Sequence, residues 1–329
     1  MGRRCAQDCA AVNRRDDPDA LLSSARAGDR GAVARLISLV EQGGEAARAV
    51  GRLVFPLGGR AYTVGITGPP GSGKSTLTSR LIGTLRARGS EVGVLAVDPS
   101  SPFTGGALLG DRVRMQDHAL DAGVFVRSMA TRGHLGGLAL ATPEAVRVLD
   151  AVGIPVVLVE TVGVGQVEVE IAGAADTTIV VVNPGAGDSI QANKAGLFEV
   201  ADLFVINKAD RPGAREAERD LQMMLDMDPL MGEWRPPVLQ TVASEGKGIE
   251  ELWAAVDKHR EFLTGSGVLG ERRRKRTADE LREIVVRRIE QRAKQVSGGD
   301  DFDRVLDAVL SRDIDPYSAA EEILAALGL

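Results

Sequence analysis

Aliphatic runs alternate with amphipathic stretches through the middle of the chain. The runs are rich in Val, Ile and Leu and span residues 62–66, 92–97, 156–159, 178–182, 203–206 and 238–240. Such runs are typical of strands that are buried on both faces of a parallel sheet. Helical patterns lie between them, for example Leu77, Leu81, Ile82 and Leu85 on one face. The alternation predicts an α/β domain with a doubly wound, mostly parallel sheet over residues 59–264.

Residues 1–58 are predicted to form a helical extension that follows a polar leader. Apolar side chains recur there at helical spacing and comprise Val33, Leu36, Ile37 and Val40. Gly43-Gly44 follows this stripe after two polar residues, and glycine is a common helix stop.

Residues 265–329 are predicted to form a second helical extension. One apolar stripe comprises Leu281, Ile284, Val285 and Ile289, and a second comprises Phe302, Val305, Leu306, Val309 and Leu310. A last helix should begin at Asp315-Pro316, a capping residue followed by proline at the first helical position. We interpret these helices as an arm that packs on a second subunit. Packing on the chain's own domain is the alternative.

The composition narrows the class of protein. The 329 residues carry a formal net charge of −6, which disfavours a general nucleic-acid or membrane-surface binder. Aromatic residues make up only 3%, so the core must depend on aliphatic side chains. The N-terminal stretch contains no signal-peptide pattern, and no segment approaches the roughly 20 apolar residues of a membrane helix. We therefore expect a cytoplasmic protein with no membrane or nucleic-acid partner.

A phosphate-binding motif follows the first predicted strand. The motif G-x-x-x-x-G-K-[ST] is matched by Gly68, Pro69, Pro70, Gly71, Ser72, Gly73, Lys74 and Ser75, with Thr76 next. Glycines let backbone N–H groups wrap a phosphate chain at the positive end of a helix. Lys74 would contact the β- and γ-phosphates of a nucleotide, and the Ser75 hydroxyl would bind Mg²⁺. The motif predicts a P-loop nucleotide triphosphatase.

Three carboxylates are candidates for the magnesium site. Asp98 ends a predicted strand, Asp111 lies beyond a glycine-rich stretch, and Glu160 ends the run IPVVLVE. Carboxylates at strand C-termini face the ligand crevice of open α/β sheets, and Mg²⁺ prefers oxygen ligands. A capping or turn role is the alternative for Asp98 and Asp111. Glu160 stands where many P-loop GTPases have aspartate, so it could hold a metal-bound water or position the attacking water.

An N-K-x-D motif predicts that the nucleotide is GTP or GDP. Asn207, Lys208 and Asp210 follow a predicted strand. A carboxylate at this place accepts from guanine N1–H and the 2-amino group, whereas adenine has no matching pair of donors. Asn207 should brace the phosphate loop, and the Lys208 stem should cover the purine. After the next strand, Val242, Ala243 and Ser244 could offer a backbone N–H to the guanine carbonyl.

Four longer stretches resemble the MeaB-type GTPases, chaperones of methylmalonyl-CoA mutase whose older name is ArgK, an arginine/ornithine transport kinase. They are VDPSSPFTGGALLGDRVRM (97–115), RSMATRGHLGG (127–137), ETVGVGQVEVEI (160–171) and NPGAGDSIQANKAG (183–196). The resemblance implies a homodimer joined by its C-terminal helices. It also implies a GTPase that gates adenosylcobalamin delivery to a cobalamin-dependent acyl-CoA mutase and protects that enzyme.

The resemblance also suggests roles for particular residues. It assigns Asp98 and Asp111 to the Mg²⁺-responsive region, and it makes residues 183–196 an additional switch loop. The working residues of that loop would be Asp188, Gln191 and Lys194, with Lys194 stabilising charge on the γ-phosphate. On the residues alone, the stretch is a glycine-rich loop that enters a helix. We expect another loop around the glycines that are flanked by Arg127, Arg132 and His134. This loop could contact phosphate or a partner, or it could be an ordinary surface loop.

Two other functions compete with the regulatory GTPase. The first is a small-molecule kinase acting on arginine or ornithine, although no acceptor pocket is legible in the sequence. The second is a metallochaperone GTPase for nickel or cobalt, which would need closely spaced His or Cys ligands. The three histidines, His118, His134 and His259, are far apart in sequence, and both cysteines lie in the leader.

Overall fold

The computed structural model describes residues 16–99, 118, 120–131, 137–161, 174–185, 200–227, 233–296 and 300–326. The candidate residues Asp111, Asp188, Gln191 and Lys194 lie outside these ranges, as do Arg132 and His134. The chain divides into two compact units, Met1–Leu269 and Gly270–Leu329. The first unit contains the sheet and the candidate nucleotide site.

A parallel sheet forms the centre of the first unit. Its seven strands in the described part of the chain have the order β3-β2-β4-β1-β5-β6-β7. The strands are β1 (Tyr62–Thr67), β2 (Val92–Pro99), β3 (Val124–Thr131), β4 (Val156–Thr161), β5 (Thr177–Val182), β6 (Leu203–Asn207) and β7 (Val238–Thr241). Every neighbouring pair is parallel, so the carboxyl ends of the strands share one edge. The α/β class expected from the sequence is confirmed.

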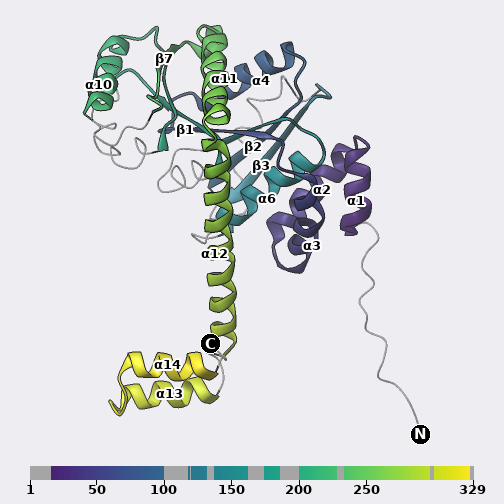
Figure 1. The fold of residues 1–329 in the computed structure, drawn as a ribbon, viewed down its shortest axis with the longest axis vertical. Helices are drawn as coiled ribbons and strands as arrows, with labels where there is room; N and C mark the ends of the chain where they lie inside the picture. Colours follow the sequence, from purple (N-terminus) through teal and green to yellow (C-terminus); the bar gives the residue numbers. More distant parts are fainter. Residues whose placement is uncertain are drawn as a thin grey trace. The chain divides into compact units, whose positions relative to one another are not determined.

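Helices cover both faces of this sheet, as expected of a doubly wound fold (Figure 1). On one face, α4 (Lys74–Ala87) and α11 (Ile249–Gly265) share a core with β1, β2 and β4. On the other face, α6 (Gly137–Ala151) packs against β2, β3 and β4, and α10 (Ala214–Asp226) packs against β5 and β6. Alternate residues of a strand serve the two faces: Val92 and Val94 point to the first core, and Leu95 and Val97 point to the second.

The N-terminal helices belong to the core of the first unit. They are α1 (Pro18–Arg26), α2 (Arg30–Gln42) and α3 (Gly44–Val54), followed by the short 3-10 helix η2 (Phe55–Leu57). The stripe predicted from the sequence is the buried face of α2, where Leu36 and Ile37 are fully buried beside α6 residues such as Leu149. These helices therefore extend the layer that α6 begins.

Strand β3 is a feature that the sequence analysis missed. Arg127 was expected to belong to a loop, but it lies inside β3, in register with Leu95 of β2. Its Nη2 donates to Glu41 Oε2 at 2.6 Å and to Ser38 Oγ at 2.9 Å, both on α2. Strand β3 is one of the two edge strands of the sheet, and its polar residues Arg127 and Ser128 interrupt the apolar run that would have predicted a strand.

A polar chain connects the amino-terminal ends of three strands, at the sheet edge opposite the phosphate motif. Tyr62 Oη lies 2.5 Å from Thr177 Oγ1, which lies 2.8 Å from His259 Nδ1. His259 Nε2 lies 3.3 Å from Asp202 Oδ1, and the His259 side chain is fully buried. Burial raises the pKa of Tyr62 to about 12, so this hydroxyl stays neutral. The chain fixes β1, β5 and β6 relative to α11.

The second unit is helical. It contains most of α12 (Val268–Val296), together with α13 (Asp300–Leu310) and α14 (Pro316–Ala326). Asp315 caps α14 because its Oδ1 accepts from Tyr317 N at 2.9 Å, so the helix begins at Pro316 as expected from the sequence. Val305 and Ala319 are buried where α13 and α14 pack together. The α12 stripe is solvent-exposed in the single chain and comprises Leu281, Ile284, Val285 and Ile289.

Asp150 provides a test of how the first strand is held. Its carboxylate, near the end of α6, accepts from the backbone N–H groups of Gly59, Arg60 and Ala61 just before β1. We predict that Asp150→Ala lowers the free energy of unfolding of the first unit by about 2 kcal/mol, because these amides lose an acceptor. Urea unfolding followed by tryptophan fluorescence measures this, since both tryptophans, Trp234 and Trp253, lie in this unit.

Asp220→Ala is the matched control, because Asp220 is an exposed carboxylate on α10. Its effect should stay within about 0.5 kcal/mol of wild type. Equal losses in both variants would contradict the role assigned to Asp150.

Candidate nucleotide-binding site

The phosphate motif forms the loop between β1 and α4, where backbone crowding requires glycine at two positions. Gly68 has a φ of +135°, and a Cβ added there would lie 2.1 Å from the Val181 carbonyl oxygen. Gly73 has a φ of +90°, and its Cβ would lie 2.3 Å from Asn207 Nδ2. Both the left-handed conformation and the close contact exclude a larger residue. The two glycines therefore seat the loop against β5 and β6.

Lys74 lies at the start of α4 with its side chain buried. Its Nζ donates to Gly68 O at 2.7 Å and to Pro69 O at 3.0 Å, so the ammonium group is folded over the loop. Phosphate oxygens are charged acceptors and form stronger hydrogen bonds to an ammonium than neutral carbonyls do. The ammonium group is thus held where a bound phosphate chain could compete for it.

Ser75 and Glu160 form the candidate metal centre. The Ser75 hydroxyl donates to Glu160 Oε1 at 2.6 Å, and the two residues are only 6% and 2% exposed. Glu160 is in register with Ile66 of β1 and Ala96 of β2, at the carboxyl edge of the sheet. A hydroxyl and a carboxylate are the hard oxygen donors that Mg²⁺ accepts alongside several waters. These residues therefore fit the metal expected from the sequence.

Asp98 belongs to the same edge of the sheet. It lies in β2, in register with Ala130 of β3, two residues beyond the partner of Glu160. Its strand position agrees with the placement expected from the sequence, and its side chain is outside what the structure describes. Within the described residues, no three His, Cys, Asp or Glu side chains gather as a metal site.

Asn207 joins the phosphate loop to the loop after β7. Its Nδ2 donates to Ser72 O at 2.8 Å, which is the brace expected from the sequence. Its Oδ1 accepts from Thr241 Oγ1 and from Ala243 N, each at 3.1 Å. The side chain is 2% exposed, so these bonds are shielded from competing water.

The other residues of the N-K-x-D motif lie beside this brace. Lys208 has a left-handed backbone, with a φ of 59°, and its Nζ donates to Gly71 O at 2.6 Å. A left-handed conformation is uncommon outside glycine and concentrates at binding sites. Asp210 is exposed. The pKa of Lys247 is raised mainly by its ion pair with Glu245, and the negative charge of Asp210 adds a smaller contribution. Asp210 is thus accessible to a ligand.

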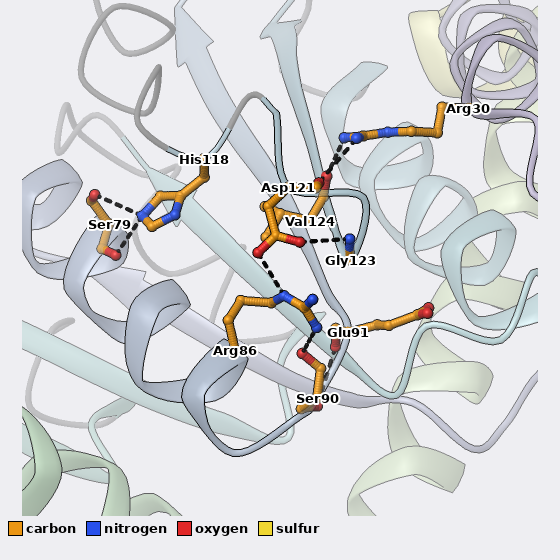
Figure 2. Close-up of polar contacts among 9 residues, drawn as sticks. All are labelled: Arg30, Ser79, Arg86, Ser90, Glu91, His118, Asp121, Gly123 and Val124. Carbon is orange, nitrogen blue, oxygen red and sulfur yellow. Dashed lines mark hydrogen bonds and ion pairs between the residues drawn. The ribbon is translucent and has the colours of Figure 1, made fainter.

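Residues 118 and 120–123 lie directly before β3 and are anchored on two sides, a feature with no signal in the sequence (Figure 2). His118 Nε2 lies 2.9 Å from Ser79 O on α4, and an Arg86–Asp121 ion pair at 2.8 Å adds a second contact to that helix. This ion pair lowers the pKa of Asp121, mainly through the hydrogen bond from Arg86. On the other side, Arg30 at the start of α2 donates to the carbonyls of Asp121 and Val124. The segment therefore links the P-loop helix to the N-terminal helices.

A scan against protein-family models matches residues 33–297 to a family described as "Methylmalonyl Co-A mutase-associated GTPase MeaB". The match covers the phosphate loop, Glu160 and the N-K-x-D motif, and it ends before α13. The chain belongs to the MeaB family. It is therefore a P-loop GTPase, and the resemblance noted in the sequence is confirmed.

Relatives and a solved structure agree with membership of the MeaB family. A protein of Pyrococcus abyssi that is named as a GTPase is 55% identical over 309 residues, covering 93% of this chain and 95% of its own length. GTPase ArgK of Escherichia coli is 37% identical over 287 residues, covering 85% of this chain and 86% of the relative. The crystal structure of a LAO/AO transport system kinase has a TM-score of 0.72 at 29% identity, covering 95% and 98% of the two chains.

None of the described helices of this MeaB-family chain combines the length and hydropathy needed to cross a bilayer.

Replacement of Asn207 tests whether its side chain organises the site. We predict that Asn207→Ala weakens GDP binding by about tenfold or more, because three hydrogen bonds that align the two loops are lost. Isothermal titration calorimetry with GDP and Mg²⁺ measures the change.

Gln240→Ala is the matched control, because Gln240 on β7 loses only an exposed hydrogen bond, from its Nε2 to Glu218 Oε2 at 2.8 Å. Its effect on GDP affinity should be within about threefold of wild type. Similar losses of GDP affinity in the two variants would mean that the hydrogen bonds of Asn207 do not organise the site.

Proposed function

We propose that this chain is a GTP-binding and GTP-hydrolysing chaperone of a cobalamin-dependent acyl-CoA mutase. The mutase would be methylmalonyl-CoA mutase or a close relative, and the GTPase would gate adenosylcobalamin loading and protect the enzyme in the cytoplasm. The match of residues 33–297 to a mutase-associated GTPase family is the observation that carries this proposal. The geometry of the site supports its GTPase part.

The phosphate loop and Lys74 would hold the triphosphate. The non-proline residues of 68–76 would supply backbone N–H groups at the start of α4, and Lys74 would exchange the carbonyls of Gly68 and Pro69 for phosphate oxygens. The Ser75 hydroxyl and the Glu160 carboxylate would hold Mg²⁺, with Asp98 and Asp111 as further candidates. Bound there, the metal would neutralise charge on the β- and γ-phosphates.

Glu160 would also set the position of water. Glu160 accepts from the Ser75 hydroxyl at the start of α4, so its carboxylate would lie near the end of a bound phosphate chain, where it could hold a metal-bound water or the attacking water. Asp188, Gln191 and Lys194 are proposed to complete the site from an additional switch loop. Lys194 would then stabilise charge that develops on the γ-phosphate.

Asp210, Lys208 and the loop after β7 would read the base. Asp210 would accept from guanine N1–H and the 2-amino group, and the Lys208 stem would lie over the purine. Among Val242, Ala243 and Ser244, the first two amides already donate, to Lys247 O and Asn207 Oδ1 respectively. The Ser244 amide is therefore the candidate donor to the guanine carbonyl.

The chain is also proposed to act as a homodimer through residues 265–329. In the single chain, α12 exposes Leu281 and Val285 at 62% and 48%, an apolar stripe that a second copy would cover.

A small-molecule kinase is the competing function. It is favoured by the name of the solved relative, a transport system kinase. Formation of phosphoarginine from GTP and arginine would support it, whereas hydrolysis of GTP without transfer supports the chaperone.

Substitution of Asp210 tests the base assignment. We predict that Asp210→Asn weakens GDP binding by about 100-fold or more, because charge-assisted bonds to two donors are lost. The same variant should gain affinity for xanthosine diphosphate, whose 2-carbonyl accepts from the new amide. Competition binding with both nucleotides measures the change in preference, and a variant that still favours GDP would exclude this role for Asp210.

Capture of the partner tests the chaperone assignment. We predict that the immobilised full chain retains a cobalamin-dependent acyl-CoA mutase from native lysate, in different amounts with GDP and with a non-hydrolysable GTP analogue. Lys74→Ala is the control, because loss of the phosphate contact should abolish the nucleotide dependence. Mass spectrometry identifies the captured enzyme. Absence of any such mutase in both nucleotide states would contradict the proposed partner and leave the GTPase assignment intact.

A further inference from the structure

Arg80 joins the P-loop helix to the loop after β7. It lies on α4, and its Nε donates to Ala243 O at 2.9 Å. Its Nη2 donates to Ser244 O at 2.7 Å. A guanidinium group is a rigid fork, so two successive carbonyls held by one fork are fixed in both position and orientation. Neither the P-loop motif nor the N-K-x-D motif includes this residue.

The backbone N–H groups on either side of Ser244 already donate hydrogen bonds, within the loop or to Asn207. Val242 N donates to Lys247 O at 3.1 Å, Ala243 N donates to Asn207 Oδ1 at 3.1 Å, and Glu245 N donates to Val242 O at 2.9 Å. Within the described residues 242–247, the Ser244 N–H is the backbone N–H that donates no hydrogen bond. That amide is the one that can be offered to a ligand.

The planarity of the peptide bond connects Arg80 to this amide. In a trans peptide, the C=O of one residue and the N–H of the next point in opposite directions. Arg80 holds the Ala243 carbonyl toward α4, so the Ser244 N–H of the same peptide points away from α4. The bond from Ala243 N to Asn207 fixes the other side of Ala243 to the N-K-x-D end of β6. The orientation of the peptide between Ala243 and Ser244 is therefore fixed by Arg80 on one side and by Asn207 on the other.

We propose that Arg80 is a positioning residue for guanine recognition, fixing the peptide between Ala243 and Ser244 so that the Ser244 N–H donates to guanine O6. This inference rests on the proposed GTP site. It divides base reading between two groups: Asp210 senses N1–H and the 2-amino group, and the Ser244 amide senses O6. Because Arg80 and Lys74 lie on the same helix, α4 sets the phosphate end and the carbonyl end of the site together.

Two analogues of GDP separate these readings. The nucleotide 6-thio-GDP keeps N1–H and the 2-amino group but replaces O6 with sulfur, a weaker acceptor. Inosine diphosphate keeps O6 and lacks the 2-amino group.

Calorimetry with Mg²⁺ gives the affinities of wild type and Arg80→Ala for GDP, 6-thio-GDP and inosine diphosphate. Arg80→Ala should lower the preference for GDP over 6-thio-GDP by about 3- to 10-fold, the range of one neutral hydrogen bond. Its preference for GDP over inosine diphosphate should be unchanged.

Arg88→Ala is the matched control, since Arg88 follows directly after α4 and forms exposed ion pairs with Glu250 and Asp257 on α11. Both preferences should equal those of wild type in this variant. Arg80→Lys keeps the aliphatic stem and one cation, so an intermediate preference for GDP over 6-thio-GDP is expected, and this variant serves if Arg80→Ala does not fold.

Three results would overturn the inference. One is a wild-type protein that binds GDP and 6-thio-GDP equally, and another is an Arg80→Ala variant whose two preferences are both unchanged. The third is an equal fall of both preferences, which would assign Arg80 a general structural role. Wild-type protein that binds no guanine nucleotide at all would instead overturn the proposed function together with this inference.

Discussion

The three hydrogen bonds of Asn207 hold the candidate site together. One side chain at the end of β6 donates to the phosphate loop and accepts from two groups at the end of β7. This contact explains why Gly73 has no side chain, since a Cβ would occupy the place of the amide. It also explains how motifs more than 130 residues apart in sequence, such as Ser72 and Asn207, act as one site. Arg80 adds a second connection between the same two regions from α4.

The two edges of the sheet have different chemistry. At the carboxyl edge, Lys74, Ser75 and Glu160 are buried polar groups gathered around the phosphate loop. At the amino edge, the polar chain from Tyr62 to Asp202 connects buried side chains of β1, β5 and α11 with Asp202, just before β6. Buried polar groups are costly unless they are paired, so the contacts at the amino edge favour one arrangement of these strands, whereas the groups at the carboxyl edge would suit an anionic ligand.

The sequence predicted the strands that form aliphatic runs, including the edge strand β7, and missed the other edge strand, β3. The six aliphatic runs all became strands, and the stripes of α2 and α12 had the predicted helical spacing. Strand β3 was missed because the polar residues Arg127 and Ser128 interrupt its apolar run, and Arg127 pairs with Glu41 on α2. Motif residues such as Asn207 were predictable because their contacts follow from fixed spacing beside a strand. Arg80, His118 and Asp150 were not, since their partners are backbone carbonyls or amides far away in sequence, which leave no side-chain pattern to detect.

Guanine-nucleotide binding at the phosphate loop and the N-K-x-D motif is tested most directly by titration calorimetry of the full, folded chain with Mg²⁺. GDP and GTP should each give saturable heat, while ADP at the same concentration should give none. Absence of heat for both guanine nucleotides would contradict the nucleotide site, and the proposed chaperone role would fail with it.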